Sequence, residues 1–600
     1  MVVTDDAFHS SDSVRTDGPL KHTQTVTFDR PVALELGGRL PGVTVAYETY
    51  GRLNEAQSNA VLICHGLSGD SHVAAHDADD DPGWWDVCVG PGKPIDTDRH
   101  FVICPNVLGG CRGSTGPSSI NPDTGQPYGA DFPTITINDM VDAQRMLMDH
   151  LGIDSLLAVV GGSMGGQMVM SWAIRYPDHA VGFVPLATAP RVSSQALAFD
   201  VVGRNAILHD PNFAGGQYYD QQAGPTIGLA LARMIAHVTY LSRESMAQKF
   251  DVTRYQPRDV PVEFEKTFSV GSYLGYLGAK FVGRFDPNSY MAITMAIDLF
   301  DLGATAEQLM PLFANVPGRW LIVSFSSDWL FPPRQSRTIV RSLLAGARPV
   351  SYCNITSSCG HDAFLLADDV AIYGELIRGF LNNLNGGENP LGEQIHRHGR
   401  GSIFAAERLD YDHIVDLIEP GASVLDLGCG TGAMLGSLQR RGHEQLVGVE
   451  IDEHAILECI RAGLDVIHAD LENDLDQFGD KQFDCVVLSR TLQVVHNVQG
   501  VMDEMLRIGR QCVVSFPNFG YHKLRKMLAE QGRAPEAGVL RHKWYNTPNL
   551  RFLSVADFED FCSEHGITVH VQQFLDTELG VDVVDDPNLN ADLAIFVISR

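Results

Sequence analysis

The residues best suited to chemistry in this chain are a serine between glycines and, far downstream, an aspartate and a histidine. Ser163 lies in the pattern G-x-S-x-G, formed with Gly161 and Gly165. Between a strand and a helix, this pattern predicts a nucleophile elbow, a sharp turn that projects the serine hydroxyl from the edge of a sheet. Glycines flank the serine because backbones approach one another closely in such a turn.

The residues around the serine supply that context. Five apolar residues, Leu156–Val160, predict a short buried strand, and Gln167–Arg175 predicts a helix. The N-terminus of such a helix offers N–H groups and a positive dipole end to a developing anion. The alternative interpretation is a glycine-rich loop with an ordinary serine.

Asp328 and His361 favour the catalytic interpretation. They follow two predicted strands, Trp320–Phe325 and Val350–Ile355, in the chain order Ser, Asp, His of an α/β-hydrolase fold. We therefore expect His361 to take the proton of Ser163 while Asp328 holds the imidazole in the required tautomer.

Two backbone amides complete the expected catalytic group. The predicted strand Ala60–Cys64 ends in a turn that contains Leu67, where this fold supplies one N–H of the oxyanion hole. The other N–H comes from the residue after the nucleophile, which is Met164. Loss of one such donor typically lowers the rate by a factor on the order of 10²–10³.

The elements that must position these residues alternate between strands and helices. Further strands are predicted at Gly42–Tyr50 and Phe101–Cys104, and a helix at Asn138–Leu151. The alternation predicts an α/β fold with a mostly parallel, doubly wound sheet. It lapses over roughly residues 190–318, where helical segments predict a lid over the sheet edge. These segments are Gln195–Leu208, Ile227–Ser242 and Asn288–Phe300.

A second alternating unit follows a polar stretch at Asn382–Arg400. We expect an α/β-hydrolase domain over residues 1–385, a linker over 386–402 and a second, Rossmann-like α/β domain over 403–600. Because a chain of 600 residues exceeds the size of a single hydrophobic core, more than one domain is expected.

The second unit opens with a strand, a glycine-rich turn and two acidic residues that each follow a later strand. Its D-x-G-x-G-x-G pattern differs from the G-x-G-x-x-G of dinucleotide sites and resembles the class I S-adenosylmethionine-binding fold. The resemblance implies that the glycines admit the methionine part and the ribose, that Glu450 accepts from the ribose hydroxyls, and that Asp470 lies near adenine. The expected binding residues are Asp426, Gly428, Gly430, Gly432, Glu450 and Asp470.

Composition and charge narrow the class of partner. The formal net charge of −30 argues against nucleic acid or an anionic membrane as the main partner. The eleven cysteines include no C-x-x-C pair, so we expect neither a disulfide framework nor a metal site. The polar N-terminus and the lack of a long apolar run predict no signal peptide, no membrane span and a cytoplasmic location.

Six linked segments in the first domain resemble the homoserine O-acyltransferase (MetX) family. In that family, an arginine in the lid and the aspartate after the catalytic histidine hold homoserine, which implies these roles for Arg233 and Asp362. A guanidinium suits the α-carboxylate and a carboxylate suits the α-ammonium. Alternatively, Arg233 forms a lid salt bridge and Asp362 caps the following helix. The segments are His65–Asp70, Asn106–Pro117, Gly161–Gly166, Ala232–Ser242, Ser326–Pro333 and Ser358–Leu366.

The acyl donor is inferred from the residues after Asp328. Succinyl-using members of the family tend to carry an arginine two positions after the catalytic aspartate, whereas this chain has Leu330 there. A succinyl carboxylate needs a cation in its pocket, so acetyl-CoA is the expected donor. Arg334 and Arg337 lie nearby in sequence and leave succinyl-CoA as the alternative.

Residues from about 400 to 600 resemble the methionine biosynthesis protein MetW, so the whole chain resembles a MetX/MetW fusion. The resemblance lies in VLDLGCGTG, VGVEID, HADLEN, LSRTLQVV, VSFPNFGYH and HKWYNTPN. The second domain is expected either to methylate an unidentified acceptor or to bind S-adenosylmethionine as a regulatory module. Fusion keeps the two domains in equal number and at a high effective concentration.

Together these features predict acetyl transfer from acetyl-CoA to the hydroxyl of L-homoserine by a ping-pong mechanism. We expect no prosthetic group, small-molecule substrates and a homodimer. A Ser–His–Asp triad by itself does not distinguish acyl transfer from hydrolysis. An esterase is therefore the second alternative.

Overall fold

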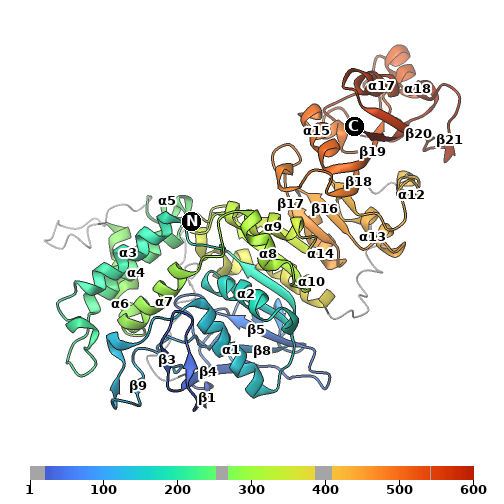
Figure 1. Cartoon of the computed structure of the whole chain (residues 1–600). Helices are drawn as coiled ribbons and strands as arrows, with labels where there is room; N and C mark the ends of the chain where they lie inside the picture. The colour runs from blue at the N-terminus through green and yellow to red at the C-terminus, as the bar shows by residue number, and fades with distance from the viewer. Residues whose placement is uncertain (1–19, 252–267, 385–407, 541) are drawn as a thin grey trace. The chain divides into compact units, whose positions relative to one another are not determined.

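The structure, a computed structural model, describes residues 20–251, 268–384, 408–540 and 542–600. The chain divides into two compact units, one made of Met1–Pro349 with Asn354–Asn385, the other of Val350–Cys353 with Gly386–Arg600. Figure 1 colours the first unit from blue to yellow and the second from yellow-orange to red. The expected linker, residues 386–402, lies outside the described residues.

The first unit is built on a mostly parallel sheet. Strands β5, β8, β11, β12 and β13 pair in parallel, whereas β1 and β4 add to the β8 edge in antiparallel pairs. The strand order is β1 (Gln24–Phe28), β4 (Val43–Tyr50), β8 (Phe101–Pro105), β5 (Ala60–Cys64), β11 (Leu156–Gly162), β12 (Ala180–Leu186), β13 (Arg319–Phe325) and β14 (Val350–Ile355), of which Asn354 and Ile355 fall in this unit. Short two-stranded pairs are β2 (Val32–Ala33) with β3 (Arg39–Leu40), β6 (Val89–Gly90) with β7 (Ile95–Asp96) and β9 (Ile120–Asn121) with β10 (Gln126–Pro127).

The central strands of this sheet form the core of the first unit. Every residue of β5 and β11 is buried. Strands covered on both faces are continuous apolar runs, which explains why the sequence predicted them clearly. The helices that pack against the sheet are α1 (Ile137–Leu151), α2 (Met164–Arg175), α9 (Pro333–Ala345) and α10 (Ala367–Leu384).

Local sequence signals account for the ends of α1. Thr136 and Asp139 form a reciprocal capping box at its start, and Gly152 ends it in a left-handed conformation with φ 68°. The start of α2 differs from expectation, because it begins at Met164 rather than Gln167. The elbow sets this start, and its packing overrides the poor helix propensity of the two intervening glycines.

A group of helices lies between β12 and β13 in the chain. Helix α3 packs against α4, and α4 packs against α6. The expected helix Ile227–Ser242 ends earlier, at Tyr240, because Ser242 caps the next helix by accepting the Ser245 N–H. The helices are α3 (Ser194–Leu208), α4 (Thr226–Tyr240), α5 (Arg243–Phe250), α6 (Ser269–Val282), α7 (Pro287–Leu299) and α8 (Ala306–Phe313).

The strands of the second unit form parallel pairs up to β19 and antiparallel pairs beyond it. Its strand order is β17 (Asp465–His468), β16 (Leu446–Glu450), β15 (Val424–Leu427), β18 (Phe483–Ser489), β19 (Gly509–Pro517), β22 (Leu593–Ser599), β20 (Thr568–Asp576) and β21 (Val581–Asp582). Its helices are α12 (Leu409–Asp416), α13 (Ala433–Arg440), α14 (Glu453–Arg461), α15 (Val498–Ile508), α16 (His522–Lys526), α17 (Val555–Glu564) and α18 (Pro587–Asn590).

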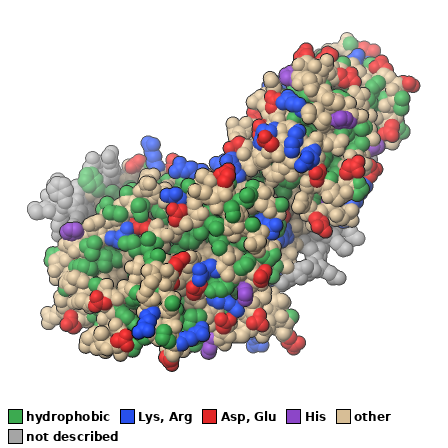
Figure 2. All heavy atoms as spheres, viewed as in Figure 1, with side chains coloured by type: hydrophobic (Ala, Val, Ile, Leu, Met, Phe, Trp, Pro, Cys, Tyr) green, Lys and Arg blue, Asp and Glu red, His purple; other side chains and the backbone are tan. Residues whose placement is uncertain are grey.

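Figure 2 shows acidic, basic and hydrophobic side chains interspersed over the visible face of each unit. Within the described residues, no helix combines the length and apolar character needed to cross a membrane. All eleven cysteines are free thiols.

Candidate active site

Ser163 lies on a sharp turn between β11 and α2. Its backbone has φ 58° and ψ −123°, a conformation that residues other than glycine rarely adopt. The Ser163 N–H donates to the Leu186 carbonyl at 3.0 Å, and Thr188 Oγ1 donates to the Ser163 carbonyl at 2.8 Å. These hydrogen bonds to the end of β12 hold the strained turn in place.

The glycines of the G-x-S-x-G pattern are required by space. A Cβ atom at Gly165 would lie 2.1 Å from the Cys64 carbonyl oxygen, and one at Gly161 would lie 2.6 Å from the Gly165 backbone. Both distances are far inside van der Waals contact, so a side chain at either position would force β5, β11 and α2 apart. The pattern therefore reflects the close approach that the sequence predicted.

His361 lies between Ser163 and Asp328. Its Nε2 atom is 2.9 Å from Ser163 Oγ, and its Nδ1 atom is 2.8 Å from Asp328 Oδ2. His361 and Asp328 are only 3% and 2% exposed. The structure thus brings together three side chains that follow three different strands of the sheet.

The turn after β13 determines which nitrogen of His361 can accept a proton. Asp328 Oδ1 accepts the N–H groups of Leu330 at 3.0 Å and Phe331 at 2.9 Å, while Oδ2 contacts His361 Nδ1. Because an ionised carboxylate only accepts, Nδ1 carries the proton. Nε2 is then the nitrogen that can accept from the Ser163 hydroxyl.

The turn after β5 lies beside the elbow, since a Cβ atom at Gly66 would be 3.9 Å from Ser163 Cβ. His65 holds this turn from within the core. Its Nε2 accepts the Val107 N–H at 3.1 Å, so Nδ1 carries the proton and donates to the Gly66 carbonyl at 2.7 Å. This histidine therefore links the turn that bears Leu67 to the loop after β8.

A cavity opens at Ser163 between the turn after β5, the loop that carries His361, and helix α4. Leu67 lines it, whereas Met164 is fully buried at the first position of α2. The lining residues are Gly66, Leu67, Ser68, Gly69, Trp84, Ser163, Arg233, His237, Tyr240, Arg284, His361, Asp362, Phe364, Leu365 and Leu366.

Arg233 and Asp362 bring opposite charges to this cavity. Arg233 is 4% exposed, and its guanidinium carbon lies 4.6 Å from the centre of the Phe281 ring and 5.7 Å from that of Tyr240. Such cation–π contacts orient a buried guanidinium. Asp362 follows His361 in the 3-10 turn η6 (Gly360–Leu365) and lines the same cavity. The pair matches the carboxylate and ammonium of an amino acid.

Arg284 and His237 line the cavity but were not among the site residues predicted from the sequence. Arg284 Nη2 donates to the Ser68 carbonyl at 2.7 Å, a contact between segments distant in sequence that no local pattern reveals. His237 follows Arg233 by one helical turn on α4, so helical periodicity places both on one face and could have revealed it.

Leu330, the expected donor-specificity residue, is half-buried and is not among the lining residues of this cavity within the described structure. Its N–H donates to Asp328 Oδ1. Arg334 and Arg337 belong to α9 and do not line the cavity either. Arg233 and Arg284 are the two arginines among the described residues that line this cavity.

In the second unit, the glycine-rich turn follows β15 as the sequence predicted. Gly428, Gly430 and Gly432 have φ of 75°, 55° and 77°, which L-residues rarely adopt. Glu450 Oε2 accepts the Gly430 N–H at 2.8 Å, and its Oε1 accepts the Ile451 N–H at 2.8 Å. The carboxylate at the end of β16 thus supports the turn directly.

Asp426 and Asp470 differ in their surroundings. Asp426 is 3% exposed at the end of β15, and its burial, opposed by Arg408, raises its pKa to about 7. Asp470 accepts the Glu472 N–H at 2.9 Å and the Asn473 side-chain amide at 2.6 Å, so its carboxylate is engaged in its own turn.

The fold and this geometry define the first unit as an α/β-hydrolase-fold protein. A family model described as alpha/beta hydrolase fold matches residues 59–368, and the model of methionine biosynthesis protein MetW matches residues 408–598. A "Bifunctional methionine biosynthesis protein MetXA/MetW" of Rhodopirellula baltica is 50% identical over 98% of the chain and 95% of the relative. The chain belongs to this bifunctional MetXA/MetW family, which confirms the resemblance and the fold class expected from the sequence.

Other relatives match the first unit and differ in their acyl group. A "Homoserine O-succinyltransferase" of Halothiobacillus neapolitanus is 50% identical and covers 62% of this chain and 92% of its own. A "Homoserine O-acetyltransferase" of Methanohalobium evestigatum is 53% identical and covers 56% of this chain and 68% of its own.

Solved structures of two different activities have the same fold. The homoserine O-acetyltransferase from Bacillus anthracis is 31% identical with a TM-score of 0.54, covering 60% of this chain and 98% of that one. Esterase E22 is 31% identical with a TM-score of 0.55, covering 60% of this chain and 100% of that one. The backbone alone therefore does not separate acyl transfer from ester hydrolysis.

Proposed function

We propose that the first unit, residues 1–385, transfers an acetyl group from acetyl-CoA to the hydroxyl of L-homoserine, giving O-acetyl-L-homoserine and CoA. The chain is a homoserine O-acyltransferase of methionine biosynthesis, the activity named in its relatives. The observation that carries the mechanism is the hydrogen-bonded series from Ser163 through His361 to Asp328 beside a cavity.

In the first half-reaction, Ser163 Oγ attacks the thioester carbonyl while His361 Nε2 takes its proton. The amides of Leu67 and Met164 stabilise the tetrahedral oxyanion. The C–S bond then breaks, and the CoA sulfur leaves with the proton held by His361. The product of this step is an acetyl ester on Ser163.

In the second half-reaction, Arg233 binds the carboxylate of homoserine and Asp362 binds its ammonium group. These contacts leave the side-chain hydroxyl directed at the acyl ester. His361 takes the hydroxyl proton as the oxygen attacks, and it returns the proton to Ser163 Oγ when the ester bond breaks. Fixing both ends of the acceptor favours homoserine over water.

A specific observation favours succinyl transfer as the second candidate function. Arg284 lines the cavity, and a guanidinium there can donate hydrogen bonds to the distal carboxylate of a succinyl group. Relatives named for each acyl group have similar identity to this chain. We favour acetyl because Leu330 stands where the succinyl-using members tend to have arginine.

The decisive experiment offers acetyl-CoA and succinyl-CoA in parallel, each with and without homoserine, and follows release of the free CoA thiol. Homoserine-dependent release with acetyl-CoA supports the proposal. Faster turnover with succinyl-CoA would replace acetyl by succinyl, and sustained release without homoserine would indicate an esterase.

For the second unit, residues 403–600, we propose S-adenosylmethionine binding at the turn between β15 and α13. The left-handed glycines, the Glu450 contact and the match to the MetW family model support this site. Two roles stay open, methyl transfer to an unidentified acceptor and regulation of the acyltransferase. Calorimetric titration with S-adenosylmethionine tests binding, and formation of S-adenosylhomocysteine distinguishes methyl transfer from regulation.

A further inference from the structure

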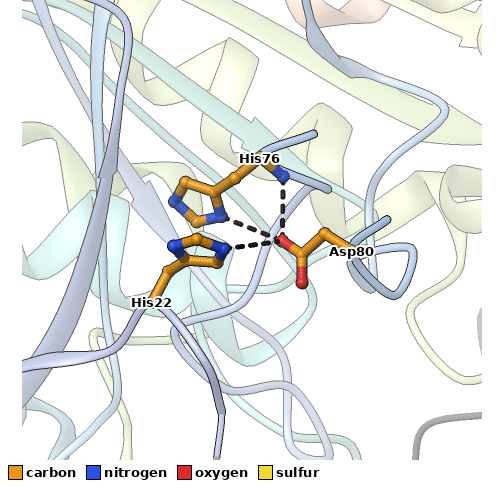
Figure 3. A group of neighbouring side chains, drawn as sticks. All are labelled: His22, His76 and Asp80. Atoms are coloured by element: carbon orange, nitrogen blue, oxygen red, sulfur yellow. Dashed lines mark hydrogen bonds and ion pairs between the residues drawn. The ribbon is translucent and has the colours of Figure 1, made fainter. Parts of the chain in front are cut away.

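Two histidines and an aspartate meet in the first unit, and none of them is among the residues that line the Ser163 cavity. His22 precedes β1, whereas His76 and Asp80 belong to the loop between β5 and β6. Figure 3 shows the two imidazoles, one above the other, with a nitrogen of each directed at the Asp80 carboxylate. Segments more than fifty positions apart in the sequence thus contribute to one cluster.

The spacing of the donor atoms matches that of a metal site. His76 Nδ1 lies 3.2 Å from Asp80 Oδ2, and His22 Nε2 lies 3.8 Å from the same oxygen. All three donor atoms lie within 4.8 Å of one another. Donors bound at about 2.0–2.2 Å to a tetrahedral Zn²⁺ are roughly 3.3–3.5 Å apart. The two nitrogens are therefore within a few tenths of an ångström of the distance from Asp80 Oδ2 that a shared ion requires.

His22 supplies a second observation, because its Nε2 atom is shielded from solvent and has no hydrogen-bond partner within the described part of the chain. The 3.8 Å contact with Asp80 is too long for a hydrogen bond. A buried polar atom without a partner carries a free-energy cost. A metal ion between His22, His76 and Asp80 would satisfy this nitrogen.

The surroundings hold the donors in place. The His76 ring stacks on the rings of His22 and Tyr50, each with a centroid separation of 4.2 Å. Behind it, Glu48 Oε2 lies 3.7 Å from His76 Nδ1 and accepts from His72 at 2.9 Å and Tyr50 at 2.8 Å. Glu48 is fully buried, so it adds a fixed carboxylate next to the donors.

We propose that His22 Nε2, His76 Nδ1 and Asp80 Oδ2 form a binding site for Zn²⁺. Two imidazole nitrogens and one carboxylate oxygen suit zinc better than Mg²⁺ or Ca²⁺, which prefer oxygen ligands. The side chains of His22 and His76 are 30% and 20% exposed, so the cluster lies close to the protein surface. The sequence predicted no metal site because the chain has no paired cysteines. The proposed ligands are histidine and aspartate, on which that argument has no bearing.

The proposed ion acts as a structural clip. It links the segment before β1 to the loop between β5 and β6, which also carries Trp84 of the cavity wall. Binding to the folded chain alone raises the free energy of unfolding, and cross-linking distant segments restricts the unfolded state. None of the three ligands lines the cavity, so this site is independent of the acyl-transfer mechanism.

The test titrates ZnCl₂ into the full chain, freed of any affinity tag and stripped of metal with a chelator, and follows binding by calorimetry. We expect one site in the unmodified protein, weakened at least about tenfold in Asp80→Asn, His76→Gln and His22→Gln. The matched control is Asp79→Asn, which makes the same charge change at an exposed position of the same loop and should bind normally.

A second readout uses Co²⁺, whose visible spectrum reports coordination by nitrogen and oxygen. We expect the visible absorption bands of bound Co²⁺ in the unmodified protein and in Asp79→Asn. These bands should be lost in the three ligand variants. Zn²⁺ affinity unchanged in those variants would overturn the proposal, since it would indicate other ligands, such as the partly exposed Cys111 or Cys359. Absence of Zn²⁺ binding by the unmodified chain would overturn it as well.

Discussion

At the scale of single residues, Asp328 Oδ2 determines which nitrogen of His361 is basic. In Asp328→Asn, the side-chain oxygen can still accept from the amides of Leu330 and Phe331, while the amide nitrogen faces His361 Nδ1. The imidazole must then carry its proton on Nε2, where it cannot accept from serine. We expect kcat to fall by about 10⁴-fold with the fold retained.

The measurement is steady-state release of CoA thiol, with circular dichroism to confirm folding. Asp368→Asn is the matched control, because Asp368 is exposed and loses the same charge. Equal activity of the two variants would contradict the proposed role of Asp328.

Arg233 permits a test of acceptor binding at the same scale. A charged hydrogen bond contributes about 1.5–3 kcal/mol, so Arg233→Met should raise the KM for homoserine by roughly 10- to 150-fold. Acetylation of Ser163 by acetyl-CoA alone, followed as a burst of thiol, should change little. A burst lost in parallel with homoserine turnover would indicate that Arg233 serves the donor instead.

At the scale of elements, the packing of α3 on α7 places two carboxylates together. Asp200 and Arg204 belong to α3, and Arg204 Nη2 contacts Asp298 Oδ2 of α7 at 2.6 Å. Burial and the nearby Asp298 charge raise the pKa of Asp200 to about 8. The helix pair therefore holds a proton that the unfolded chain releases near pH 4.

This proton makes stability depend on pH. Between about pH 4 and 8 the folded form binds one more proton than the unfolded form, so stability falls as pH rises, by up to about 1.4 kcal/mol per pH unit, and levels off above about 8. Asp200→Asn should remove this slope and be the more stable form at pH 8. Urea unfolding from pH 6 to 9 measures how the free energy of unfolding depends on pH. The control is Asp220→Asn at an exposed position. Parallel pH profiles for both variants would contradict the assignment.

At the scale of the whole molecule, one chain joins two units with separate sites. If the second unit binds S-adenosylmethionine, ligand at 100 times its Kd should stabilise that unit by about 2.7 kcal/mol. Glu450→Ala should abolish this effect, because Glu450 supports the Gly430 turn.

Scanning calorimetry of the full chain measures the shift in unfolding temperature, and exposed Glu444→Ala is the control. The same samples, assayed for acyl transfer with and without ligand, show whether the two sites communicate. A shift that persists in Glu450→Ala would place the ligand elsewhere.

Local patterns in the sequence predicted the elements well. The bounds of β5 and β14 agree with the predicted strands, because buried strands are short apolar runs that end in turns. The elbow was predictable because only glycine fits the close contacts at Gly161 and Gly165. The order of Ser163, Asp328 and His361 was visible because each residue follows a predicted strand.

The sequence by itself therefore determined the fold class, the elbow at Ser163, and the order of Ser163, Asp328 and His361. All of these depend on short-range patterns and chain order. Only the tertiary structure decided that Arg284 reaches the cavity and that His22 meets His76 and Asp80. These contacts join segments far apart in the chain, and their side chains show no periodicity or spacing before folding brings them together. Proximity created by folding has no local signature, and for that reason sequence patterns did not reveal these contacts.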